Sequence, residues 1–94
     1  MFSGGTYDEV ARWLQNFVAA HAKRENVRAE VELDAGEGQE GTSYAARVRL
    51  GEKFSPPIEF EFGDVARNRG SLEWCATLAA RVREVVRNLG AVVA

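Results

Sequence analysis

Residues 44–50, YAARVRL, alternate along their whole length between apolar positions and small or positively charged ones. A period of two residues is typical of a β-strand with one buried and one solvated face, because successive side chains point to opposite faces of a sheet. The apolar positions are Tyr44, Ala46, Val48 and Leu50, and the other face carries Ala45, Arg47 and Arg49. The stretch therefore predicts a half-buried strand with a basic outer face.

The same period appears on either side of this stretch. In residues 27–34, VRAEVELD, and in residues 58–62, IEFEF, apolar residues again alternate with charged ones, among them Glu30, Glu32, Glu59 and Glu61. In an antiparallel meander with residues 44–50 in the middle, Arg47 and Arg49 would lie between two acidic strands. Facing opposite charges favour that order by roughly 0.2–1 kcal/mol per pair. We therefore predict a three-stranded meander whose charged face is solvated rather than a binding surface.

A first helix is predicted before these strands. Residues 6–9, TYDE, form a capping box, in which a threonine hydroxyl and a glutamate carboxylate each satisfy a backbone N–H of the first turn. Apolar residues then recur at spacings of three and four and form one stripe: Val10, Trp13, Leu14, Phe17, Val18 and His21. The spacing predicts an amphipathic helix from about Tyr7 to Ala22.

A second helix is predicted after the strands. Ser71 is its expected cap, and Gly90 is its expected end, because glycine readily adopts the backbone conformation that follows a helix. The preceding residues 63–70, GDVARNRG, are interpreted as a turn or a short helical piece. The apolar tail at residues 91–94, AVVA, could pack on the sheet, add a short edge strand or join a dimer contact.

These segments predict one α+β domain over residues 1–94, of order α-β-β-β-α, with both helices packed on one face of a three-stranded antiparallel meander. The order resembles the double-stranded RNA-binding domain across about residues 6–89, with residues 70–80, GSLEWCATLAA, in the corresponding place at the start of the last helix. That family has two lysines after this turn, where this chain has Leu72 and Glu73. Its first hairpin loop carries a Gly-Pro and a His, where this chain has Glu37 and Glu40. The resemblance implies the fold, whereas these replacements do not favour RNA.

Residues 36–41, GEGQEG, match the glycine pattern of dinucleotide-binding loops. That motif requires a helix after the glycines, whose N-terminus holds the pyrophosphate, and here a predicted strand follows. Glu37 and Glu40 would also repel phosphate, and with Asp34 they fit no ordered calcium loop. We therefore interpret the segment as a mobile acidic hairpin loop, and we expect no cofactor and no metal.

Few residues are available for catalysis. His21 and Cys75 are the sole histidine and cysteine, and each lies on the apolar stripe of a predicted helix. Two such ligands do not make a zinc site, which needs three or four, and no third group is placed to orient the histidine. We expect both to be packed core residues and the protein not to be an enzyme.

Composition restricts the partners. A net charge of −2 gives no overall attraction to nucleic acid or to an anionic lipid surface, and no apolar run reaches the length of a membrane span. The N-terminal residues show no secretory signal, and a single cysteine forms no internal disulfide, so a cytoplasmic location is expected.

Two function classes remain. The first is a non-catalytic protein-interaction or assembly module, including a homodimer, with a candidate partner surface at Trp74, Val92 and Val93. The alternative is a nucleic-acid-binding module. Its support is an excess of three positive charges between Val65 and Gly90, where two acids accompany five arginines: Arg67, Arg69, Arg81, Arg83 and Arg87. The two classes differ in whether those arginines form one continuous basic patch.

Overall fold

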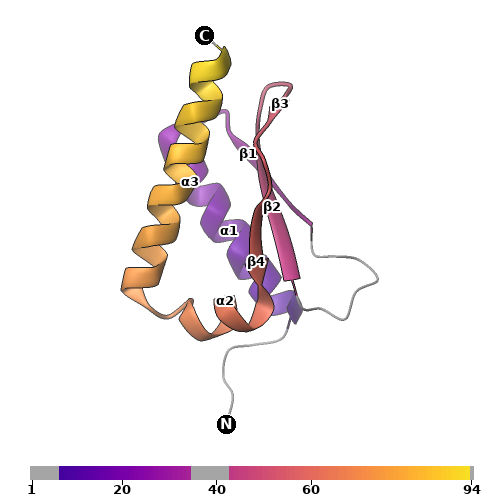
Figure 1. The fold of residues 1–94 in the computed structure, drawn as a ribbon, viewed down its shortest axis with the longest axis vertical. Coiled ribbons are helices and arrows are strands. Elements are labelled where there is room, and N and C mark those ends of the chain that lie inside the picture. Colours follow the sequence, from indigo (N-terminus) through magenta and orange to yellow (C-terminus); the bar gives the residue numbers. More distant parts are fainter. Residues whose placement is uncertain (1–6, 35–42, 94) are drawn as a thin grey trace.

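The computed structural model describes residues 7–34 and 43–93. Three helices pack on an antiparallel sheet of four strands, which confirms the α+β class (Figure 1). The elements in chain order are α1 (Tyr7–Glu25), β1 (Glu30–Asp34), β2 (Ser43–Leu50), β3 (Lys53–Phe54), β4 (Ile58–Glu61), α2 (Phe62–Asn68) and α3 (Leu72–Val93). The helices lie on one side of the sheet, and α1 crosses behind α3 in this view.

The central strand is β2, as the YAARVRL pattern predicts. β1 pairs with one side of β2, and both β3 and β4 pair with the other side. The register places Val31 opposite Val48 and Phe60 opposite Tyr44. All four apolar residues of the β2 pattern are buried, since that face meets the helices.

The structure contains a short strand that was not predicted, β3, before the predicted third strand, which is β4; Ser55 and two prolines divide the two. A proline has no N–H to donate to a sheet, so Pro56 and Pro57 cannot continue the ladder. Ser55, only 4% exposed, makes two hydrogen bonds to the backbone of Val48 just before the prolines. Its N–H donates to the Val48 carbonyl (2.8 Å), and its Oγ accepts the Val48 N–H (3.0 Å).

This division corrects the predicted charge pattern on one side of β2. On the β1 side, Glu30 faces Arg49 and Glu32 faces Arg47, as expected. On the other side, Glu59 faces Ala45 and Glu61 faces Ser43, so the acidic residues of β4 do not meet the arginines. The prolines displace β4 toward the beginning of β2, and β3 brings Phe54 beside the arginines instead. Phe54 faces Arg49, and the Arg47 guanidinium lies 5.8 Å from the centre of its ring.

The helices depart from their predicted bounds at three points. α1 begins at Tyr7 but continues one turn beyond Ala22, to Glu25. α2 confirms the short helical piece expected before Ser71, but it begins at Phe62, which was predicted as the last residue of the third strand. α3 begins after Ser71, whose Oγ accepts the Trp74 N–H (3.2 Å), as predicted for a cap. It does not end at Gly90 but runs to Val93, so part of the predicted tail is helical.

Gly90 lies inside α3 and next to the end of β2. A Cβ at this position would lie 3.7 Å from a Leu50 methyl carbon, so α3 passes close to the end of β2 there. One apolar residue is also placed differently from its prediction. Val27 lies in the turn before β1 and is 81% exposed, because the strand begins three residues later, at Glu30.

The first turn of α1 is joined to the start of β2 by two tyrosines. The rings of Tyr7 and Tyr44 stack with their centres 4.5 Å apart. The Tyr44 hydroxyl donates to the Tyr7 carbonyl (2.8 Å), and the Tyr7 hydroxyl donates to the Ser43 carbonyl. Burial raises the pKa of Tyr44 to about 12, because its ionised form is poorly solvated there.

Candidate functional site

Trp74 is the predicted partner-surface residue that the structure can place. It lies in the first turns of α3, half-buried, and its ring stacks on Trp13 of α1 with centres 6.4 Å apart. One side of Trp74 therefore belongs to the helix contact, while the residue also lines a surface groove. Val92 and Val93 are in the last turn of α3, and their side chains lie outside the described part of the structure.

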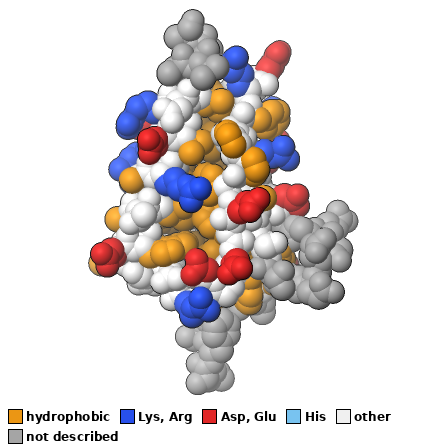
Figure 2. All heavy atoms as spheres, in the orientation of Figure 1, with side chains coloured by type: hydrophobic (Ala, Val, Ile, Leu, Met, Phe, Trp, Pro, Cys, Tyr) orange, Lys and Arg blue, Asp and Glu red, His pale blue; other side chains and the backbone are white. Residues whose placement is uncertain are grey.

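This groove, the α3–β4 groove, has a volume of about 450 Å³. Its walls come from three elements: Glu59, Phe60 and Glu61 of β4, Asp64 of α2, and Trp74, Thr77, Leu78 and Arg81 of α3. Figure 2 shows hydrophobic side chains gathered along the seam between α3 and the strands, with acidic side chains beside them. The groove combines an apolar floor with a charged rim.

A second hollow continues along the same side of α3. It has a volume of about 580 Å³ and lies between β3 and the second half of the helix. Its lining residues are Lys53, Phe54, Ser55, Pro56, Val85, Asn88 and Leu89. Phe54 is 48% exposed here. The seam between α3 and the β3–β4 edge is thus apolar along much of its length.

The rim of the α3–β4 groove is predominantly acidic. Three carboxylates, those of Glu59, Glu61 and Asp64, face one guanidinium, that of Arg81. Asp64 also lies 3.7 Å from Arg67. Among the described residues, no ion pair involves Glu59 or Glu61. Negative charge on this rim is therefore left for an incoming group.

The structure separates the arginines of the nucleic-acid alternative. Arg81 lies in the α3–β4 groove, whereas Arg87 pairs with Glu25 of α1, with Nε 3.3 Å from the carboxylate. Since each helical residue turns the chain by about 100°, Arg81 and Arg83 point to different flanks of α3. Arg67 and Arg69 lie in α2 and just after it. The five arginines do not lie together on one flank.

His21 is half-buried and packs on Phe17, with ring centres 4.5 Å apart. Its Nδ1 is buried and has no hydrogen-bond partner among the described residues. Burial lowers the pKa of His21, and the positive charges of Arg24 and Arg83 lower it further.

Cys75 is half-buried at the other end of the helix pair. Its thiol donates to the Arg69 carbonyl (3.4 Å). His21 is near the later part of α3, where the charge of Arg83 acts on it. Arg83 follows Cys75 by eight residues of α3, about 12 Å along the helix axis at the usual rise per residue. The structure does not bring the histidine and the cysteine together.

Sequence reasoning missed most of the groove. Glu59 and Glu61 were expected on a solvated sheet face, and Asp64 was in a segment of undecided structure. The two adjacent prolines before residue 58 were the available signal, since prolines interrupt a ladder and can shift the register of the strand that follows. The glycine-rich residues 36–41 lie outside the described residues, so their predicted mobility and lack of nucleotide binding stay predictions.

Comparison with known proteins gives no relative. No family model matches the chain, and no curated protein or solved structure is significantly similar to it. Within residues 7–34 and 43–93, no helix has the length and apolar character needed to cross a membrane. The same residues contain no group of three or more side chains able to hold a metal ion.

Proposed function

We propose that this protein is a non-catalytic interaction module that binds a partner protein in the α3–β4 groove. The observation that carries the proposal is the groove itself, where Phe60, Trp74 and Leu78 form an apolar floor beneath an acidic rim. An apolar centre with a polar margin is the usual arrangement of protein interfaces, and tryptophan is enriched at their energetic centres.

The chemistry of the groove supports this role. Its lining combines the apolar side chains of Phe60, Trp74 and Leu78 with the charged groups of Glu59, Glu61, Asp64 and Arg81. Its one hydroxyl belongs to Thr77 and donates to the Glu73 carbonyl (3.1 Å), so it is engaged by the helix. The proposal therefore assigns recognition and no reaction to the groove. It also places the module in the cytoplasm, since the single cysteine is a free thiol.

Two arginine substitutions on neighbouring residues of α3 test the proposal. Thr77 and Ala76 are both exposed, but Thr77 lines the groove and Ala76 does not. A partner is first captured from a native lysate, purified, and titrated against each variant of the full chain. We expect Thr77→Arg to weaken the affinity by at least about tenfold, because the long side chain fills the groove, and Ala76→Arg to leave it unchanged. Equal affinities for the two variants would contradict the proposal.

Self-association is a separate proposal for the end of α3. The apolar residues Val92 and Val93 suggest a contact between two copies, which sedimentation equilibrium measures directly. We expect a dimer mass that falls to the monomer mass when residues 91–94 are deleted. A monomer mass for the full chain would remove self-association from the function.

A further inference from the structure

The hydrogen bonds of β2 determine which backbone groups of β4 point away from the sheet. In an antiparallel pair, the N–H and C=O of one residue point to the same side, and the side alternates along the strand. Both backbone groups of Val48 point toward β3, because both bond to Ser55. Tyr44 and Ala46 are four and two residues before Val48 on β2. Their backbone N–H and C=O groups therefore point to the same side as those of Val48, which is the side where β4 pairs.

The register between β2 and β4 then determines which backbone groups of β4 point away from the sheet. Phe60 is opposite Tyr44 and Ile58 is opposite Ala46, so these two residues of β4 bond to β2. Glu59, between them, directs its N–H and C=O outward, and the N–H of Glu61 points the same way. Both glutamates line the α3–β4 groove, so these outward groups lie along it.

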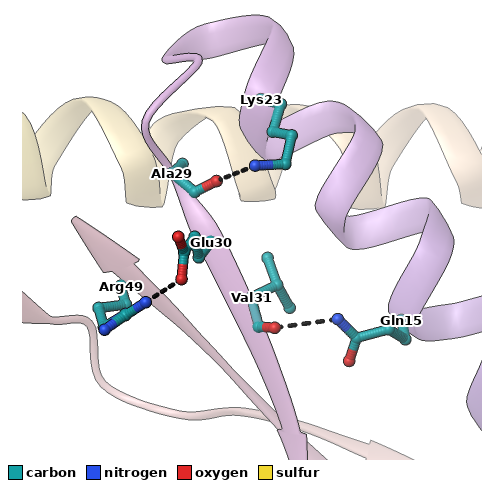
Figure 3. Close-up of polar contacts among 6 residues, drawn as sticks. All are labelled: Gln15, Lys23, Ala29, Glu30, Val31 and Arg49. Carbon is teal, nitrogen blue, oxygen red and sulfur yellow. Dashed lines mark hydrogen bonds and ion pairs between the residues drawn. The ribbon is translucent and has the colours of Figure 1, made fainter. Parts of the chain in front are cut away.

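At the opposite edge of the sheet, α1 caps two backbone carbonyls. Gln15 Nε2 donates to the Val31 carbonyl (2.9 Å), and Lys23 Nζ donates to the Ala29 carbonyl (2.9 Å). Figure 3 shows both side chains reaching from α1 to the outer side of the β1 segment. These carbonyls point away from β2 and would otherwise be open to another strand. Among the described residues, no side chain makes a corresponding bond to the backbone of Glu59 or Glu61.

We propose that the partner binds as an added β-strand along the outer edge of β4, and that this strand alternates basic and apolar residues. The inference rests on the proposed function of the α3–β4 groove and specifies the partner's chemistry. Addition of an extended segment to a sheet edge is a common mode of peptide recognition, in which main-chain bonds give affinity and alternate side chains give specificity.

The side chains of β4 determine the alternation. A partner residue opposite Glu59 or Glu61 has that carboxylate as its direct neighbour, so lysine or arginine is favoured there. A partner residue opposite Phe60 points to the other face of the sheet, toward the helices, where Trp74 and Leu78 line the groove. An apolar side chain is favoured at that position.

Charge also excludes a second copy of β4 as the occupant. In an antiparallel pair of two β4 strands, centred on Glu59 or Phe60, glutamates of one copy would face glutamates of the other. Like charges directly opposite each other are destabilising. The edge is therefore suited to a basic partner strand and not to itself.

Three synthetic heptapeptides test the inference on the full chain. The first alternates lysine and valine, the second has the same composition with its lysines and valines in two blocks, and the third alternates glutamate and valine. Affinities and backbone amide shifts are measured by NMR titration. We expect the first peptide to bind at least about tenfold more tightly than either of the others, with its largest shifts at Glu59 and Glu61.

Two changes sharpen the result. N-methylation of the peptide residue opposite Glu59 removes the peptide N–H that would donate to the Glu59 carbonyl. This change should abolish binding. The double variant Glu59→Lys, Glu61→Lys should reverse the preference to the glutamate–valine peptide, since both positions are exposed and the swap restores opposite charges.

Each alternative outcome has a defined meaning. Equal binding of the alternating and block peptides, with shifts at Trp74, would overturn strand addition and leave the interaction role in place. Shifts at Val31 instead of Glu59 would overturn the choice of edge. Absence of binding by the lysine–valine peptide would overturn the inference, while the Thr77→Arg comparison decides the proposed function independently.

Discussion

β1 and β4 each pair with one side of β2, but their outer edges meet different parts of the molecule. The carbonyls along the β1 side accept hydrogen bonds from Gln15 and Lys23 of α1. The corresponding groups of β4 lie beside a groove lined by α3. In the sequence both strands alternate glutamate with apolar residues, so the strands themselves give no sign of the difference. The availability of a sheet edge is set here by side chains of the helix beside it.

The largest effect is expected from weakening the attachment of the open edge to β2. Ser55→Ala removes the oxygen that accepts the Val48 N–H and leaves that buried group without a partner. We expect the free energy of unfolding to fall by about 1–3 kcal/mol, the usual cost of an unsatisfied buried donor. Urea denaturation followed by circular dichroism measures it. Glu52→Ala, in the exposed hairpin turn, is the control, and an equal stability of the two variants would contradict the role given to Ser55.

The second change opens the closed edge. Gln15→Met keeps the approximate shape of the side chain but loses the donor to the Val31 carbonyl. We expect a loss of about 0.5–1.5 kcal/mol in the free energy of unfolding. The matched control is Asn16→Met, on the exposed side of α1. If both variants denature at the same urea concentration, the β1 edge does not depend on Gln15.

The third change concerns the charges on the outer face of the closed edge. Arg49 and Glu30 face each other across β1 and β2 and form an ion pair, but both side chains are substantially exposed. A double-mutant cycle with Arg49→Ala and Glu30→Ala should give a coupling free energy of roughly 0.2–1 kcal/mol. The coupling should decrease in about 1 M salt, where exposed charges are screened. A coupling that is independent of salt would contradict this description.

The smallest effect is expected from pH, through His21 on α1. The pKa of His21 is lowered in the folded protein by burial and by Arg24 and Arg83. The unfolded chain therefore binds a proton more readily, and stability should decrease as pH falls below about 6.5, the ordinary value for histidine. His21→Gln should remove this part of the decrease, as measured by thermal unfolding between pH 7 and pH 5. An unchanged pH profile would show that another group is responsible.

The sequence predicts those parts of the fold that depend on local periodicity. The alternation in residues 44–50 correctly identifies a half-buried strand, and the stripes of α1 and α3 identify two helices. The central place of that strand was predicted from facing charges, which the structure confirms on the β1 side only. The ends of the helices are less well predicted. α3 continues through Gly90 to Val93, although a glycine at this position is typical of a helix end. Local pattern therefore identifies the helix but not its last residue.

The candidate site was harder to predict because it depends on register. The charges of Glu59 and Glu61 were correctly placed on a strand, but their partners on β2 depend on how Ser55 and the two prolines separate β4 from β3. Trp74 was identified as a surface aromatic, whereas its neighbours in the groove come from three separate elements. Residue type was predictable, and the juxtaposition was not.

The tyrosine pair at the base of α1 has a consequence for protein engineering. Tyr7 and Tyr44 are 37 residues apart in the chain, and their rings stack. The bonds of their hydroxyls, from Tyr44 to the Tyr7 carbonyl and from Tyr7 to the Ser43 carbonyl, hold the start of β2 against α1. On the other side, Asp34 pairs with Ala45, so the chain is anchored on both sides of residues 35–42. Lengthening an anchored connection costs only about 0.6 kcal/mol per doubling of its length. That segment is therefore a suitable position for grafting a foreign epitope or a reporter sequence.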